Sequence, residues 1–346
     1  MATWIAFHLT DRCQLDCQHC LRDPAKTPKD LPLDILRKTL TEARDFYGMA
    51  HVGLTGGEPT LHPEFPAVID TIVELGFTWH MVTNARRFEH TIKLLKAVPS
   101  RRKALTAIDF SLDGADEKTH DTIRGKGSYR EVMLGATICM AHEIPFILQM
   151  VVNAKNVHQI EDFGLLASNL RAKRASFGMM QPTGTHLDRE LYLSPAQWKG
   201  AYERLLRLRA ALKIEVVTAE GFPVEKPFHV CDPWKSEQLH VDVEGRLNLC
   251  CMHAGTPGSR RDVGGDLHEM PLADAHRRLL GVIHEAQSAR LDELAKPATE
   301  WTDFACNGCL KHFGKPHWSG NGAAGPEAQR ERWRGAWDKR QLRVVS

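Results

Sequence analysis

Short apolar runs alternate with amphipathic segments over the first half of the chain. The apolar runs cover residues 4–10, 51–55, 77–83, 105–112, 145–153 and 175–180. Between them, apolar positions recur at helical spacing, which predicts helices over 34–47, 68–75, 89–98, 128–142 and 158–170. Asp34 is the expected N-cap of the first helix, and Gly76 is expected to end the second.

Six strand–helix alternations predict parallel strands joined by right-handed crossovers. Such strands are covered on both faces, which explains their nearly continuous apolar runs. Either an open doubly wound sheet or a partial barrel satisfies this α/β pattern, and in both the ligands bind at the carboxyl ends of the strands. Here these ends carry the segments 13–20, 56–59, 83–84, 111–114, Asn153 and 180–184.

The alternation ends near residue 182. Ser194 and Pro195 resemble an N-cap and a first helical position, and they open a helix to about residue 212. A cysteine-rich segment follows, with a predicted hairpin that turns at Glu244-Gly245. We therefore expect a first domain over 1–226 that includes this linking helix, a small α+β domain over 227–318 and a tail over 319–346.

Composition narrows the class of protein. The chain has 346 residues, of which 42% are hydrophobic and 25% charged, with a net charge of +2. This small excess of positive charge argues against nucleic acid as a partner. No apolar run approaches the roughly 18 residues that a membrane span needs, and the N-terminus lacks a secretory signal pattern. We therefore expect a cytoplasmic protein, in which nine cysteines indicate metal or redox sites rather than disulfides.

Three of the cysteines, Cys13, Cys17 and Cys20, lie within eight residues after the first strand. Structural zinc usually takes four protein ligands. A [4Fe–4S] cluster held by three cysteines leaves one iron open, an arrangement that suits catalysis. Zinc with a distant fourth ligand is the alternative, because joint ligation by His19 and its neighbour Cys20 is strained.

The Cys13-x3-Cys17-x2-Cys20 motif resembles the cluster motif of the radical S-adenosylmethionine (SAM) enzymes. Gly56-Gly57-Glu58-Pro59 resembles the motif of that family's second strand, and residues 83–85, 111–114 and 120–125 resemble its later strand ends. The resemblance covers about the first 180 residues and implies a partial (β/α)6 barrel. It also implies that the reduced cluster cleaves SAM to a 5′-deoxyadenosyl radical, with flavodoxin or ferredoxin as the reductant.

The same resemblance implies the residues that bind SAM. Glu58 is expected to hold the amino group together with the backbone of the adjacent glycines. Arg124 is expected at the carboxylate, with a surface ion pair as its alternative role, and Asn84 in the pocket or in a turn. His19 replaces the aromatic residue usual in the family, and is expected to pack on the adenine or to act in protonation. The complete set is Gly56, Gly57, Glu58, Asn84, Ser111 and Arg124.

The later cysteines form a second pattern. It resembles the twitch domain, a shortened SPASM module that carries one auxiliary [4Fe–4S] cluster, and the implied ligands are Cys231, Cys250, Cys306 and Cys309. A cluster with four protein ligands is closed to substrate, so electron transfer is its expected task. A zinc site with the same four sulfurs is the alternative.

Two cysteines remain. Cys251 is expected to be a hydrogen-atom donor, an alternative ligand or a structural residue. Radical SAM epimerases need such a hydrogen-atom donor. The short twitch-like C-terminal segment with this cysteine resembles that of aminoglycoside epimerases and of the related aminocyclitol dehydrogenases. Cys139 falls on the apolar face of a predicted helix and is expected in the core.

The sequence therefore predicts a radical SAM enzyme that epimerises or dehydrogenates a small polar substrate. A SPASM-type peptide maturase is the alternative, although the first strand begins at residue 4 and leaves no preceding peptide-recognition domain. A zinc-binding interaction protein explains the cysteines but not the Gly-Gly-Glu-Pro motif.

Overall fold

The computed structural model describes residues 3–21, 27–182, 190–224, 226, 228–254 and 259–319. The predicted tail after Ser319 and residues 183–184 at the end of the sixth strand lie outside these ranges. None of the helices in the described ranges is both long and apolar enough to cross a membrane.

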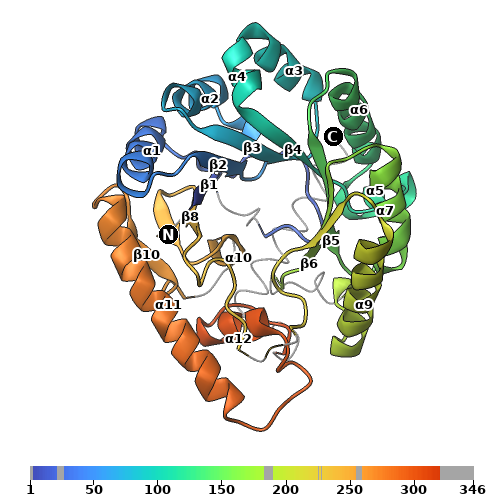
Figure 1. Cartoon of the computed structure of the whole chain (residues 1–346), viewed down its shortest axis with the longest axis vertical. Helices are drawn as coiled ribbons and strands as arrows, with labels where there is room; N and C mark the ends of the chain where they lie inside the picture. Colours follow the sequence, from blue (N-terminus) through green and yellow to red (C-terminus); the bar gives the residue numbers. More distant parts are fainter. Residues whose placement is uncertain are drawn as a thin grey trace.

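All strands belong to one sheet, which curves into a barrel that stays open on one side (Figure 1). The six predicted strands are confirmed as parallel neighbours in chain order. Their bounds are β1 Trp4–His8, β2 His51–Thr55, β3 Thr78–Thr83, β4 Leu105–Ser111, β5 Phe146–Val152 and β6 Arg174–Met179. The predicted α/β partial barrel is therefore correct.

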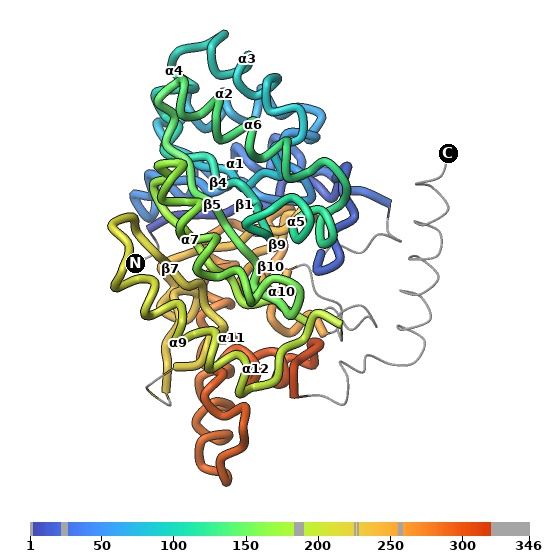
Figure 2. Tube along the Cα trace, turned by 90° about the vertical axis from the view of Figure 1, so that its right-hand side faces the viewer, coloured from blue at the N-terminus to red at the C-terminus, as the bar shows by residue number. Residues whose placement is uncertain are grey.

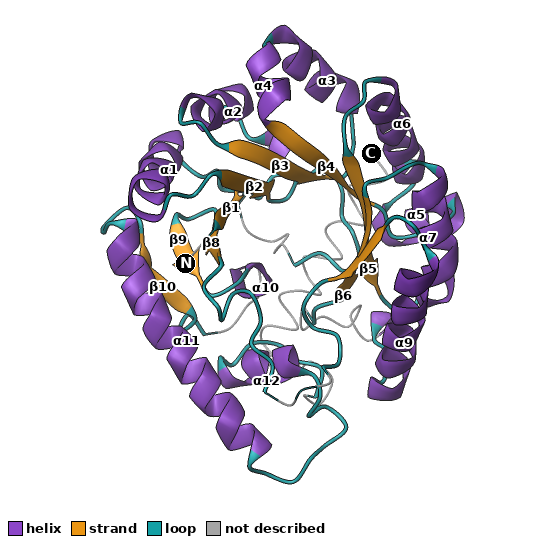
Figure 3. Cartoon of the chain, in the orientation of Figure 1, coloured by secondary structure: helices purple, strands orange, loops and turns teal. Residues whose placement is uncertain are grey.

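Helices cover the outer face of the sheet, as Figure 3 shows by colour. Those of the barrel are α1 Leu33–Tyr47, α2 Phe65–Glu74, α3 Phe88–Ala97, α4 Pro99–Ala104, α5 Glu117–Arg124, α6 Ser128–Ala141, α7 Ile160–Asn169 and α9 Pro195–Ala211, with short 3-10 turns at Pro59–Leu61 and Val157–Gln159. The predicted N-cap Asp34 lies inside the first turn of α1, because Pro32 occupies the cap position. Gly76 follows α2 in a left-handed conformation, and Cys139 is fully buried in α6.

The sheet continues beyond the predicted strands at both ends. Strand β7 (Glu215–Thr218) pairs parallel with β6, and β8 (Gln238–Val241) pairs parallel with β1. The predicted hairpin is present, because β9 (Arg246–Asn248) runs antiparallel to β8 and Gly245 takes the left-handed conformation of the turn. Strand β10 (Val263–Asp266) pairs with β9 at the edge.

The cysteine-rich segment also supplies three helices. They are α10 Cys251–Ala254, α11 Leu272–Leu294 and α12 Ala305–His312. Figure 2 shows α11 extending beyond the sheet at the end away from α3 and α4. Helices α10 and α12 lie on the open side of the barrel, between β8 and β6 (Figure 1). This arrangement brings the later cysteines towards the strand ends that carry the first three.

Candidate active site between two cysteine clusters

A cavity of about 300 Å³ lies at the carboxyl ends of the first strands. Cys13, Cys17 and Cys20 line it together. Burial raises the pKa of the Cys17 thiol to about 12, an effect that the Arg124 cation opposes. The Arg124 guanidinium donates to the Cys17 sulfur over 3.9 Å, and the side-chain amide of Asn84 donates to the Cys13 sulfur over 3.7 Å.

The two glycines after β2 line the same cavity and are required by a close approach of two loops. The Gly57 amide donates to the Thr10 carbonyl over 2.6 Å, and the Glu58 amide donates to the Arg12 carbonyl over 2.8 Å. A Cβ atom on Gly57 would lie 2.3 Å from the Arg12 carbonyl oxygen. The loop after β2 is thus packed directly on the backbone that leads into the cysteine loop.

Glu58 is placed differently from the prediction. It is 1% exposed and does not line the cavity. Its carboxylate accepts hydrogen bonds from the Thr83 hydroxyl at 2.9 Å, the backbone amide of Asn84 at 2.9 Å and the Thr60 hydroxyl at 2.8 Å. Burial raises its pKa despite these bonds. Glu58 joins the ends of β2 and β3, and the residues of its motif that face the cavity are the glycines.

Arg124 forms a buried ion pair rather than a surface one. Its Nε atom lies 2.5 Å from Asp113 Oδ2, and the Asp113 side chain is fully buried. Burial alone would lower the pKa of Arg124, but Asp113 and the Cys17 thiol hold it above its ordinary value. The Val151 amide donates to the other Asp113 oxygen over 2.8 Å, and the Asp113 amide donates to His120 Nδ1 over 2.9 Å. Ser111 lines the cavity beside this pair.

His19 lies beside the same carboxylate, with Nε2 3.4 Å from Asp113 Oδ2. Burial lowers its pKa to about 4, against the opposing effect of Asp113. The ring is therefore neutral near pH 7, which suits packing against a ligand better than proton transfer. Its Nδ1 atom is buried without a hydrogen-bond partner.

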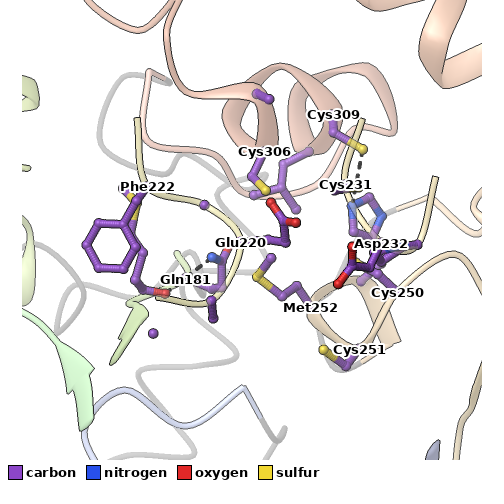
Figure 4. Close-up of a pocket in the computed structure, with 18 of the residues that line it drawn as sticks. Gln181, Glu220, Phe222, Cys231, Asp232, Cys250, Cys251, Met252, Cys306 and Cys309 are labelled. Atoms are coloured by element: carbon purple, nitrogen blue, oxygen red, sulfur yellow. Dashed lines mark hydrogen bonds between the residues drawn. The ribbon is translucent and has the colours of Figure 1, made fainter. Parts of the chain in front are cut away.

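A second cavity of about 470 Å³ lies between the barrel and the cysteine-rich segment (Figure 4). All four predicted ligands of the auxiliary cluster line it. Cys231 precedes β8, Cys250 follows β9, and Cys306 and Cys309 lie three residues apart on α12, so they share one helix face. Burial raises the pKa of Cys231 to about 12 and raises the pKa values of the other three thiols well above the ordinary range.

The two cavities meet at a small set of residues. His19, Leu21, His240, Cys251 and Met252 line both of them. Cys251 is exposed, and desolvation by the neighbouring protein raises the pKa of its thiol. Cys251 is therefore a protonated thiol near pH 7, and it is the one cysteine among the described residues that lines both cavities.

The donor sets fit the cofactors that the sequence predicts. Three thiols from one loop suit a cluster with an open iron, and four thiols suit a closed cluster. The amino acid portion of SAM fits the groups that line the cavity beside the first three thiols. These groups are Gly56, Gly57, Asn84, Ser111 and Arg124.

Sequence reasoning assigned no role to several residues of these cavities. Asp113 lies within the quoted strand-end motif, so a signal for it was present. Glu220 and Phe222 follow β7, a four-residue strand too short to be read from its apolar pattern, and both line the second cavity. Gln181 also lines that cavity, and its place just after the sixth strand is the one sequence signal for it.

Comparison with known proteins gives the same domain. Residues 7–167 match the model of the Radical SAM superfamily. The mycofactocin maturase MftC of Mycobacterium ulcerans (strain Agy99) is 29% identical over 287 residues, which are 80% of this chain and 70% of that protein. The PqqA peptide cyclase of Methylorubrum extorquens (strain PA1) is 26% identical over 259 residues, which are 72% of this chain and 66% of the cyclase. The chain thus spans about two thirds of the length of these relatives.

Solved structures with low sequence identity share the fold. Streptococcus suis SuiB bound to S-adenosylmethionine has a TM-score of 0.66 at 17% identity, over 82% of this chain and 68% of SuiB. Native anSMEcpe with bound AdoMet has a TM-score of 0.67 at 12% identity, over 99% of both chains. Residues 7–167 are therefore a radical SAM domain, and a [4Fe–4S] cluster and SAM are the cofactors of that superfamily.

Proposed function

We propose that this radical SAM enzyme modifies a peptide. The names of the relatives carry this choice, because a mycofactocin maturase and a PqqA peptide cyclase favour the peptide alternative over a small polar substrate. The observation that supports it within the chain is the second cavity, which shares the lining residues Cys251 and Met252 with the first. A peptide side chain in the second cavity reaches the place where SAM is cleaved.

The cofactor sites follow from the donor sets. Cys13, Cys17 and Cys20 hold the cluster that binds SAM, and Cys231, Cys250, Cys306 and Cys309 hold an auxiliary [4Fe–4S] cluster in a twitch or SPASM-like domain. Gly56, Gly57, Asn84, Ser111 and Arg124 contact SAM. Glu58 acts on SAM as a positioning residue, since its carboxylate fixes the backbone of Asn84 at the edge of the cavity. When bound, the reduced cluster and SAM supply a radical that abstracts a hydrogen atom from the substrate.

The test is anaerobic reconstitution followed by reaction with candidate peptides. Two clusters give about eight irons per chain. With dithionite and SAM, a short peptide encoded beside the gene should increase 5′-deoxyadenosine formation and should itself change in mass or in deuterium content. Protein that binds zinc without visible charge-transfer absorbance, or that cleaves SAM equally with and without every peptide, would contradict the proposal.

A second candidate, epimerisation, rests on Cys251. After hydrogen abstraction from one face of a peptide carbon, the Cys251 S–H bond would return a hydrogen atom to the other face. This step leaves a thiyl radical on Cys251, which one electron from the external reductant and one proton convert back to the thiol.

Cys251→Ala is the variant that separates the two outcomes. If Cys251 is the donor, the variant still forms 5′-deoxyadenosine but no longer makes the epimer, and wild-type product formed in D₂O carries one solvent deuterium. Normal product from Cys251→Ala would exclude the donor role and leave dehydrogenation or cross-linking.

A further inference from the structure

The second cavity has an end that is rich in hydrogen-bond acceptors and carries negative charge. Glu220 and Asp232 both line it (Figure 4). Among the described residues that line it there is no lysine or arginine. Asp232 already has a partner, because Lys235 Nζ lies 2.9 Å from its carboxylate. Of the two carboxylates, Glu220 is the one whose neighbour in the chain, Gly221, lies against the Gln181 side chain.

The Glu220 side chain is held in place by one contact and is still open to the cavity. His229 Nε2 lies 2.8 Å from Glu220 Oε2. Within the described part of the chain, no other hydrogen bond to this carboxylate is present, and 31% of the side chain is exposed. One oxygen thus remains available to a ligand that can donate a hydrogen bond.

A second acceptor, Gln181, faces the same space. Gln181 is 6% exposed, and its side-chain nitrogen donates to the Met179 carbonyl over 3.3 Å. Its Oε1 atom is buried without a hydrogen-bond partner. Gly221, the residue after Glu220, lies against this amide, because a Cβ atom on Gly221 would be 3.5 Å from Gln181 Nε2. A buried acceptor without a donor costs free energy until a ligand supplies one.

Two of the proposed cluster ligands, Cys231 and Cys306, line the same cavity as Glu220. Four thiolates around a cluster would make this end more negative still. Such an end favours a cation that also has N–H groups to donate, and disfavours a carboxylate.

We propose that Glu220 and Gln181 form a subsite for a positively charged nitrogen group of the substrate, an ammonium or a guanidinium. The inference deepens the proposed peptide modification by naming the substrate feature that is recognised. In Figure 4, Glu220 and Gln181 lie on one side of the cavity and Cys251 on the other, with Met252 between them. A cation at Glu220 therefore anchors the substrate at a distance from its reacting carbon, which lies towards Cys251.

The test uses probes that differ only in charge. N-acetyl-lysine methylamide, its arginine, norleucine and glutamate counterparts, and norleucine methylamide with a free amino group are titrated into the reconstituted holoenzyme by calorimetry. The lysine and arginine probes should bind about tenfold more tightly than acetylated norleucine, the range expected for one charge-assisted hydrogen bond. The free-amine probe distinguishes an α-amino group from a side-chain cation as the recognised group.

Variants of Glu220 then show whether the preference for cationic probes depends on this carboxylate. Glu220→Gln should remove the preference for cationic probes, and Glu220→Lys should shift the preference to the glutamate probe. Glu215→Gln is the matched control, because Glu215 begins β7, the strand that Glu220 follows, and forms an ion pair with Arg174 outside the cavity, so this variant should keep the wild-type preference. Iron content is measured for every variant, so that loss of a cluster is not mistaken for loss of the subsite.

The two proposals fail in different ways. Equal binding of the lysine and norleucine probes to wild-type holoenzyme, or a preference that survives Glu220→Lys, would overturn the subsite whatever the enzyme does to peptides. A charge preference that depends on Glu220, in an enzyme that modifies no peptide, would instead support the subsite and reject the peptide as substrate.

Discussion

The first cysteine site is built within one loop, whereas the second gathers its thiols from three separate segments of the chain. In the first, Cys13, Cys17 and Cys20 are accompanied by a buried cation, Arg124, with its own counter-ion. In the second, the lining residues that the structure describes include no lysine or arginine.

The second site has a buried charged network as well, in which Asp262 lies 3.0 Å from His253 Nδ1 and 3.1 Å from Lys315 Nζ, and His253 Nε2 lies 3.7 Å from the Cys309 sulfur. Asp262 and Lys315 do not line the cavity, so, among the described residues, the first site presents a cation to its cavity and the second does not.

This difference has a chemical consequence. An open iron needs a neighbouring set of groups that recognise SAM, and Arg124 is the group proposed to bind the SAM carboxylate. A closed cluster needs only its four ligands. The residues around the second site are thus free to recognise substrate, and Glu220 and Gln181 lie among them.

Removing one set of thiols at a time gives the largest expected effect. Cys13, Cys17 and Cys20 changed together to Ala should abolish SAM cleavage and lower the iron content from about eight to about four per chain. Iron assay and 5′-deoxyadenosine quantification measure both changes. The reciprocal variant, with the four later ligands changed to Ala, should also keep about four irons but should still cleave SAM. Loss of SAM cleavage in both variants would mean that the two sites are not independent.

Asp113→Asn tests the charged network of the first site. The substitution leaves Arg124 buried without its counter-ion, which should lower the free energy of unfolding by about 3–5 kcal/mol. Urea denaturation of the metal-free protein measures the change. Glu74→Gln is the control, because the Arg37–Glu74 ion pair is exposed at both ends and should contribute less than about 1 kcal/mol. Equal effects of the two variants would show that the network is not a source of stability.

The stability that the hydrogen bond between the Asp113 amide and His120 contributes should also depend on pH. His120 Nδ1 accepts the Asp113 amide, so the ring must be neutral, and burial lowers its pKa from 6.5 to about 4. Between these values the unfolded chain binds a proton that the folded chain does not. Stability from His120 is therefore complete above about pH 6.5 and is lost as the pH falls towards 4, by up to about 3 kcal/mol.

His120→Asn isolates this contribution, because its amide oxygen can still accept a hydrogen bond but does not titrate in this range. Urea unfolding of both proteins from pH 7 to pH 4.5 should show a steeper loss of stability for the wild type. Parallel curves would mean that the histidine titrates at its ordinary pKa in the folded protein.

The same contrast explains what could be predicted from the sequence. Strands β1 to β6 and the first cysteine site could be predicted, because periodic apolar runs and one short loop are local in the sequence. Strand β7, with only Glu215–Thr218, carries too few residues for a pattern, and the pairing of β8 with β1 joins residues more than 230 positions apart. The substrate-facing residues Glu220 and Gln181 depend on that long-range folding, so no local motif marks them.

Glu58 shows a different limit of sequence reasoning. Its motif identifies the strand end correctly, but the direction of the carboxylate depends on Thr83 and Asn84 on the next strand. A motif fixes which residues are near the site, whereas neighbouring elements decide which of them face it. The division of the chain near residue 226 stays a prediction.

Two glycine substitutions, one near each cysteine site, are expected to change the free energy of unfolding least. They compare the close contacts of the two sites directly. A Cβ atom on Gly57 would lie 2.3 Å from the backbone oxygen of Arg12, and one on Gly308, within α12, would lie 2.3 Å from the side-chain atom Oε2 of Glu293. The Arg12 carbonyl is fixed by hydrogen bonding, since the Glu58 amide donates to it. Gly57→Ala should therefore cost about 1–3 kcal/mol of unfolding free energy.

Gly308→Ala should cost less than Gly57→Ala, since the Glu293 side chain is 31% exposed and can move aside. Alanine also stabilises a helix interior by about 1 kcal/mol relative to glycine, which offsets the loss of that contact. Urea unfolding of the two metal-free variants measures the difference, and SAM binding should weaken only in Gly57→Ala. A larger loss of stability from Gly308→Ala would show instead that the more rigid close contact lies in the second site.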